Sequence, residues 1–216
     1  EISECLVGSE MCIRDSAKAV NSERVVLVGP DIASDDGGTM SAVFAAAAVA
    51  AVIAGNTDPS VPINGAELTL FGAAGKRLSD NEIDQLVRGG VTPIETVGGV
   101  SSPVRGITTK TSSGGAADTT WRELTTILIV DEVIPTIRSA LRTRFARSKN
   151  TAQSRGAIRS QVVLELEEMK SREIVDSYGE VLVSALKSDP TVCLVEFSFT
   201  VAHGLNRIYL TAHITV

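Results

Sequence analysis

The sequence predicts a mixed α/β (α+β) fold in two lobes, with mixed sheets packed by helices and a β-hairpin at the C-terminal end. Three observations lead to this prediction. In the first half, short apolar runs bounded by glycine and proline alternate with helical segments; two long helical segments follow; and the last twenty residues alternate with a period of two. Apolar runs and period-two stretches indicate strands. Their order with the helices indicates a layered arrangement.

The first lobe is expected to open with a buried strand at Arg24–Val28, followed by a helix at Met40–Ala54. The helix is rich in alanine and other helix formers, and Gly55 follows it as a cap. Because the helix is apolar all round, we expect it to be buried. Further elements are expected as strands at Glu67–Phe71, Thr92–Val97 and Val104–Thr109, and as a short helix behind the capping box Ser79–Glu82, with Ile83, Leu86 and Val87 on its buried face.

The second lobe is expected to follow a linker at Thr111–Ala117. A second capping-box sequence, Thr120–Glu123, predicts the start of a long helix. Pro135 lies within that helix, so we expect a kink or a break into two helices there. A further helix is expected to carry Ile158, Val162, Leu166 and Met169 on one face.

The C-terminal stretch Phe197–Val216 is predicted to form a β-hairpin, with Gly204 and Asn206 in its turn. In its first strand Val195, Phe197, Phe199 and Val201 face one way. In its second strand apolar and polar residues alternate without a break. An unpaired strand edge recruits another strand or is covered, and strand addition builds assemblies from main-chain hydrogen bonds. The residues expected to pair between subunits are Ile208, Tyr209, Leu210, Thr211, Ala212, His213, Ile214 and Thr215.

Residues Glu1–Ser16 show neither clear periodicity nor the layout of a signal peptide. They are similar to a peptide that arises when sequencing-adapter DNA is translated. We therefore expect 1–16 to be a non-native segment, and the rest to be a fragment whose true N-terminal part is missing.

No site for catalysis, a cofactor or a metal is expected. The chain of 216 residues has two histidines and three cysteines, and neither forms a ligand pattern. A nucleophile elbow is absent, and Gly72–Arg77 lacks the spacing of a phosphate loop. The longest apolar run, Ala42–Ala54, is too short for the roughly 20 residues of a membrane span. The net charge of −6 also argues against a nucleic-acid-binding protein.

The segment Arg138–Arg159 contains seven basic residues and no acidic residue. Three interpretations stay open: a solvated helix face, electrostatic docking onto an acidic protein surface, and nucleic-acid binding, which the lack of interleaved aromatic residues disfavours. The candidate contact residues are Arg138, Arg142, Arg144, Arg147, Lys149 and Arg155.

Four segments occur in a characteristic order: the Ala-rich helix Ala42–Gly55, the strand VRGITTKT at 104–111 leading into the helix Thr119–Leu141, the segment Lys149–Met169, and the closing stretch VEFSFTVAHGLNRIYLTAHITV. Taken together, they resemble the C-terminal half of contractile-tail sheath proteins of bacteriophages and prophages. The resemblance covers roughly Val25–Val216. It implies that 17–116 is the C-terminal part of a middle, subtilisin-like sheath domain and that 117–216 is the sheath C-terminal domain.

The resemblance implies a structural protein and not an enzyme. Sheath subunits polymerise as stacked rings around a tail tube, and extended arms donate strands to a sheet in neighbouring subunits. The implied partners are further copies of the chain, the tail tube, and the baseplate and tail terminator proteins, without membrane or nucleic acid. The implied location is the virion tail, assembled in the bacterial host cytoplasm. Two alternatives stay open: a sheath subunit of a related contractile injection system, and a small α/β enzyme with an unrecognised site.

Overall fold

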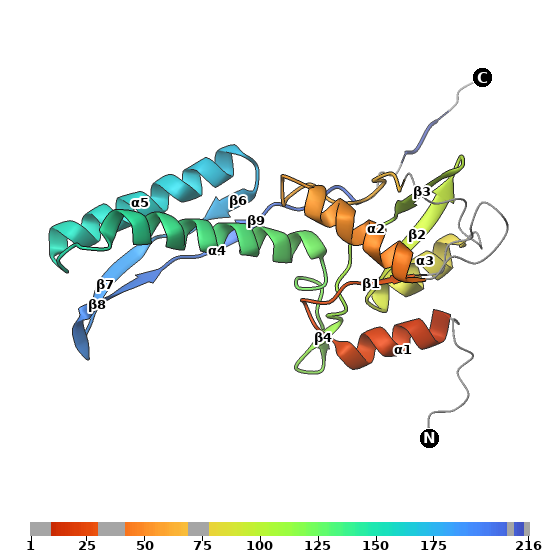
Figure 1. The fold of residues 1–216 in the computed structure, drawn as a ribbon, viewed down its shortest axis with the longest axis horizontal. Coiled ribbons are helices and arrows are strands. Elements are labelled where there is room, and N and C mark those ends of the chain that lie inside the picture. Colours follow the sequence, from red (N-terminus) through yellow and green to blue (C-terminus); the bar gives the residue numbers. More distant parts are fainter. Residues whose placement is uncertain (1–9, 30–41, 69–77, 207–209, 214–216) are drawn as a thin grey trace. The chain divides into compact units, whose positions relative to one another are not determined.

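The structure is a computed structural model of the chain, and it describes residues 10–29, 42–68, 78–206 and 210–213. It divides into two compact units. Unit 1 comprises Glu1–Thr57, Val61–Ile127 and Gly204–Val216; unit 2 comprises Asp58–Ser60 and Leu128–His203. Within the described residues, five helices accompany several small sheets, so the expected α+β class is confirmed (Figure 1).

Unit 1 is built around a small mixed sheet of order β1-β2-β3. Strand β1 runs parallel to β2, and β2 runs antiparallel to β3. The expected strand at Thr92–Val97 is therefore confirmed as β2. The elements are α1 (Glu10–Val20), β1 (Leu27–Gly29), α2 (Ala42–Gly55), α3 (Asp80–Arg88), β2 (Val91–Val97), β3 (Val100–Pro103), β4 (Ser112–Ser113) and β5 (Ala116–Ala117).

The core of unit 1 forms where α3 packs on the sheet. Leu86 on α3 is fully buried, together with Val91 and Ile107. Helix α3 begins at the expected capping box, in which Ser79 and Glu82 bond each other's backbone. Helix α1 adds Ala17, which is fully buried in the same cluster. The N-terminal part of this helix lies in the segment predicted to be non-native; that origin stays a prediction.

Helix α2 corrects the expectation of a buried Ala-rich helix. Ala45 and Val49 are buried, but Val43 is 72% exposed and Phe44 is 59% exposed. The helix packs beside β1 along one side and leaves most of its surface open. An apolar composition predicts that a helix is buried, but it does not predict how much of the helix surface is covered by other elements of the same chain.

Unit 2 packs two antiparallel helices on a long two-stranded ribbon (Figure 1). The helices are α4 (Leu124–Phe145), which lies mostly in this unit, and α5 (Ala152–Ser171). The ribbon consists of β6 (Val175–Tyr178), β7 (Leu182–Leu186), β8 (Asp189–Glu196) and β9 (Phe199–Val201). Side chains from all these layers share one core, with Ile129, Val133, Val162, Leu166 and Ile174 fully buried.

Helix α4 is continuous through Pro135, so the expected break into two helices does not occur. Proline removes one backbone donor and crowds the preceding turn. Pro135 is exposed, whereas Val133 and Ile137 on the opposite side are buried. Core packing on the buried side therefore holds the helix together through the proline.

The ribbon corrects the predicted hairpin over Phe197–Val216. Strand β9 pairs with β6, and β8 pairs with β7. The backbone N–H of Gly179 donates to the Ser198 carbonyl at 2.9 Å, which joins the two ladders into one ribbon. The sequence patterns missed β6 and β7. Among the described C-terminal residues, 202–206 and 210–213 belong to no strand, and 207–209 and 214–216 lie outside the described residues.

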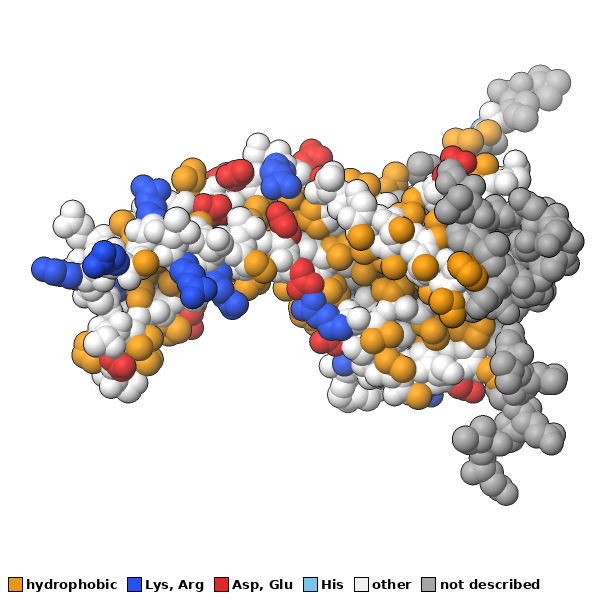
Figure 2. All heavy atoms as spheres, in the orientation of Figure 1, with side chains coloured by type: hydrophobic (Ala, Val, Ile, Leu, Met, Phe, Trp, Pro, Cys, Tyr) orange, Lys and Arg blue, Asp and Glu red, His pale blue; other side chains and the backbone are white. Residues whose placement is uncertain are grey.

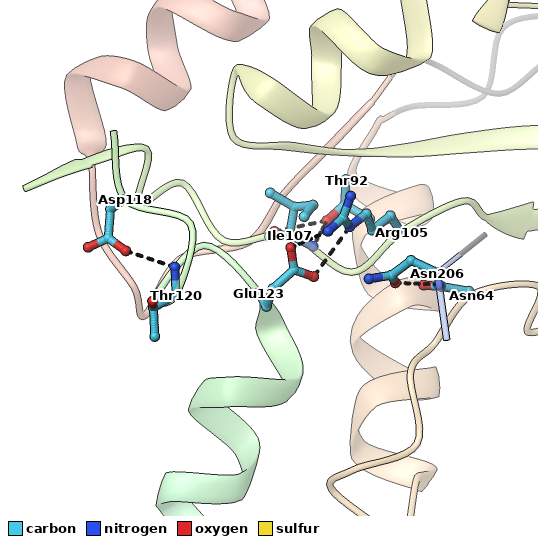
Figure 3. Close-up of polar contacts among 8 residues, drawn as sticks. All are labelled: Asn64, Thr92, Arg105, Ile107, Asp118, Thr120, Glu123 and Asn206. Atoms are coloured by element: carbon cyan, nitrogen blue, oxygen red, sulfur yellow. Dashed lines mark hydrogen bonds and ion pairs between the residues drawn. The ribbon is translucent and has the colours of Figure 1, made fainter. Parts of the chain in front are cut away.

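The sequence Thr120–Glu123 is the second correction, because it forms no capping box. Asp118 Oδ1 accepts hydrogen bonds from the backbone N–H groups of Thr120 and Trp121. The Glu123 carboxylate instead binds the Arg105 guanidinium with N–O distances of 2.6 and 3.3 Å (Figure 3). Glu123 thus forms an ion pair with a residue distant in sequence instead of capping the helix, and the local sequence does not reveal that partner.

The segments before α4 also differ from expectation. Strands β4 and β5 pair within the predicted linker Thr111–Ala117. The predicted strand Val104–Thr109 makes only an isolated bridge between Ile107 and Glu123. Of the predicted strand Glu67–Phe71, the first two residues belong to no strand, and 69–71 lie outside the described residues.

Candidate functional site

The part of the ribbon formed by β7 and β8 has apolar side chains on both faces. Val183 and Val195, paired across the two strands, pack against the core of unit 2. The opposite face is open. Its large apolar side chains are Leu182 (52% exposed), Leu186 (37%), Val192 (41%) and Leu194 (41%).

The outer edges of β7 and β8 are also open. Within the described part of the chain, these strands pair only with each other. A strand edge presents a row of backbone donors and acceptors that another strand can use. Open edges beside an exposed apolar face give this ribbon the features of a strand acceptor.

One position on the β8 edge is occupied by a side chain. Asn150, in the connection between α4 and α5, donates from Nδ2 to the carbonyls of Pro190 at 2.7 Å and Val192 at 3.3 Å. Arg155 donates in turn to the Asn150 side-chain oxygen at 3.0 Å. The guanidinium therefore fixes the amide orientation and aims its NH₂ group at β8.

The residues predicted to pair between subunits lie only partly within the described chain. Leu210, Thr211, Ala212 and His213 are described; all four are exposed, and Leu210 is 91% exposed. They form no strand with any described residue. Ile208, Tyr209, Ile214 and Thr215 lie outside the described residues.

The segment just before them is anchored in unit 1. The side-chain amide of Asn64 donates to Asn206 Oδ1 at 2.8 Å (Figure 3). At Gly204 an added Cβ would lie 3.0 Å from Pro62, so the backbone approaches this loop closely. The C-terminal segment thus starts from a contact with unit 1, and its described residues 210–213 are exposed to solvent.

The predicted basic contact residues lie around the connection between α4 and α5, where Lys and Arg side chains gather in Figure 2. The structure separates them into two groups. Arg144 donates to Gln161 and Arg155 to Asn150, so both serve the unit itself. The exposed remainder, called the basic tip below, consists of Arg138, Arg142, Arg147 and Lys149.

Two groups on unit 2 have shifted pKa values. A hydrogen bond to the Glu167 carboxylate raises the pKa of the Tyr178 hydroxyl above 10.0, and partial burial and the Glu167 charge raise it further. Hydrogen bonds from the Thr191 hydroxyl and backbone N–H lower the pKa of Asp189 below 3.8. Tyr178 is half-buried and Asp189 is exposed, and both shifts arise from nearby hydrogen bonds.

The described residues contain no group of histidine, cysteine and carboxylate side chains that could hold a metal ion. His203 and His213 are exposed, and Cys193 is half-buried on the core-facing side of β8. Gly72–Arg77 lies outside the described residues. None of the helices described has the length and apolar character required to cross a bilayer.

The described fold is an α+β chain in which two helices cover one face of a ribbon with open strand edges. Residues 116–215 match the family model of the phage tail sheath C-terminal domain. Over 205 residues, the chain is 29% identical to the tail sheath protein of Bacillus phage SP01, a match that covers 92% of this chain and 35% of that protein. The chain is therefore similar to tail sheath proteins, and the resemblance read from its sequence is confirmed.

Solved structures show the same fold at low sequence identity. A sheath tail protein from Desulfitobacterium hafniense superposes with a TM-score of 0.68 at 15% identity, covering 85% of this chain and 47% of that one. The contracted sheath complex of an extracellular contractile injection system, PVC, gives a TM-score of 0.69 at 14% identity, covering 96% and 61%. The chain spans about a third of the phage SP01 protein and about half of the Desulfitobacterium hafniense protein.

Proposed function

We propose that the chain is part of a structural subunit of a contractile tail sheath, which polymerises as a helical stack of rings around a tail tube. The family match over 116–215 is the observation that carries this proposal. The fold shared with sheath proteins supports it. The family is structural, which favours a protein without catalysis, cofactor or metal. Membrane and nucleic acid are not among the proposed partners.

Strand addition is the proposed contact between subunits. The donor is the C-terminal segment Ile208–Thr215, whose alternation suits a strand and whose described part, 210–213, is exposed. The acceptor is the open β7–β8 ribbon of another copy. Pairing there would satisfy edge groups, and apolar side chains of the added strand would pack beside those of the exposed face, at ~25 cal/mol per Å² of surface removed from water.

The basic tip is the proposed docking surface for an acidic partner, either the tail tube or the acidic face of a neighbouring subunit. The tip carries four cations on one end of unit 2, within a chain of net charge −6. Exposed charges of this kind steer association and fix orientation. Arg144 and Arg155 are less suited to this role because internal hydrogen bonds engage them.

The same reasoning applies to two kinds of assembly. One solved structure with this fold belongs to an extracellular contractile injection system, and another to an anti-feeding prophage. The sheath of such a system is therefore the second candidate. For a phage tail, assembly in the host cytoplasm and end contacts with baseplate and terminator proteins are proposed from the resemblance.

The proposal is tested by electron microscopy of the full-length protein after the upstream coding sequence is recovered. Hollow striated cylinders are expected. Thr211→Pro should abolish them, because proline removes a backbone donor from the donated strand. Thr211→Ser keeps that donor and is the matched control. Uniform small particles at every salt concentration would refute the sheath assignment.

The basic tip is tested separately by charge reversal. Arg142→Glu with Arg147→Glu should weaken docking to the tube or neighbour and reduce its salt dependence, since exposed charges act through a screened field. Lys170→Glu with Arg172→Glu makes the same charge change at other exposed positions of unit 2 and is the control. Wild-type docking by the tip variant would rule this surface out.

A further inference from the structure

The two open edges of the β7–β8 ribbon are not equivalent. On β7 the register is regular from Leu182 to Ala185. On β8 the register shifts, because Cys193 pairs with Ala185 while Asp189 pairs with Leu186. Residues 190–192 therefore have no partner in β7. A bulge of this kind bends a strand and interrupts its pairing.

Asn150 donates hydrogen bonds to two backbone carbonyls within this irregular stretch of β8. Its two amide hydrogens reach Pro190 and Val192, the acceptors that a strand added at the start of β8 would need. Arg155 holds the amide in this orientation through the side-chain oxygen, with a second, longer contact of 3.5 Å to the Asn150 carbonyl. The Asn150 oxygen accepts from Arg155 and therefore points away from β8, where it would lie against carbonyl oxygens that are also acceptors.

Beyond Val192 the edge is free. Along a strand, successive residues direct their backbone groups to alternate edges. Every second residue of 193–196 therefore presents its N–H and C=O to the outer edge. No described residue other than Asn150 bonds the outer side of β8.

We propose that Asn150, oriented by Arg155, is a positioning residue for strand addition. It closes the β8 edge at Pro190 and Val192, so that the C-terminal segment of a second copy pairs on this edge only beyond Val192, along 193–196. The residue thereby sets the register of the added strand. The proposal rests on the strand addition put forward above and adds to it the place where pairing stops.

Amide hydrogen exchange, followed by NMR, tests the proposal on the full 216-residue chain with a synthetic peptide of the sequence of residues 206–216. In the wild type the peptide should slow exchange of the outward-facing amides within 193–196 by about fivefold or more, the scale of one net hydrogen bond, and leave Val192 unchanged. In Asn150→Ala the protection should extend to Val192. Ser148→Ala, at an exposed neighbouring position outside the basic tip, should behave as the wild type.

Arg155→Ala is the second variant. It keeps the amide but frees its orientation, so protection of Val192 should be intermediate. This keeps the test decisive if Asn150→Ala weakens the fold. An unchanged pattern in both variants, or protection of Val192 in the wild type, would overturn the role of Asn150 while leaving strand addition intact. Peptide that protects no ribbon amide in any variant would overturn the acceptor assignment itself, and the positioning role with it.

Discussion

Two stretches of this chain share one pattern and have different structural outcomes. Phe197–Val201 and Ile208–Val216 both alternate with a period of two. The first is half-buried along its apolar side and pairs with β6 through Phe199–Val201. In the second, the described residues 210–213 are exposed and belong to no strand.

The difference shows what alternation can and cannot predict. A period of two says that a stretch can form a strand and which side chains share a face. It does not say whether the partner lies in the same chain. The first stretch has a core beneath it, formed by Leu166, Ile174 and Val175. The second has an anchor at Asn206 but no described core to cover.

The largest expected loss of stability comes from truncating a side chain in that core. Leu166 on α5 is fully buried in unit 2. Leu166→Ala should lower the free energy of unfolding by about 2–5 kcal/mol, through lost burial and the cavity that remains. Leu210→Ala makes the same chemical change at a position that is 91% exposed, and it should leave stability within about 0.5 kcal/mol of the wild type. Urea unfolding measures both.

The two leucine variants also separate folding from assembly. Leu210→Ala should fold normally yet assemble poorly if its side chain covers the ribbon of another copy. A marked loss of stability in Leu210→Ala would instead mean that the C-terminal segment already has an intramolecular partner. The two stretches would then not differ in where their partner lies.

A proline placed in each stretch gives the second, smaller effect. The Gly179–Ser198 hydrogen bond fixes the phase of the ladder, so the pair Ser177–Thr200 is also a bonded pair. Thr200→Pro should destabilise the chain by roughly 1–3 kcal/mol, because it leaves an acceptor unpaired. Thr211→Pro should leave the unfolding transition of the chain unchanged. Equal melting temperatures for both variants would show that β9 contributes little to the fold.

Local sequence predicted elements well where local forces decide them. The capping box at Ser79–Glu82 formed as expected, because both of its hydrogen bonds join residues three apart. The matching sequence at Thr120–Glu123 did not, because Arg105 supplies a charged partner for Glu123 and Asp118 supplies the turn. Nothing within the four residues distinguishes these cases.

The candidate site was predicted in part. The basic residues could be located from composition. Which of them are engaged inside the unit could not, because Arg144 binds Gln161 on another helix and Arg155 binds Asn150 in the connection before its own helix. The ribbon of β6–β9 was missed because β6 and β7 are short and half-exposed. The apolar residues at Leu182, Leu186 and Leu194 were a usable signal, as alternating leucines on an exposed face indicate a surface to be covered.

The smallest expected effect lies at the turn that joins β7 to β8. The Asp189 carboxylate accepts hydrogen bonds from the hydroxyl and the N–H of Thr191, which lower the pKa of Asp189 below 3.8. A lowered folded-state pKa means that the turn contact stabilises the chain above the ordinary pKa and is lost as the pH falls through the folded value.

Thr191→Ala should raise the pKa of Asp189 toward 3.8, measured by NMR titration of its carboxyl carbon. Thr211→Ala, the same change in the C-terminal segment, should leave that titration unchanged. A shift caused by Thr211→Ala would place the C-terminal segment against the ribbon of its own chain, whereas a shift confined to Thr191→Ala keeps the paired and the unpaired stretch independent.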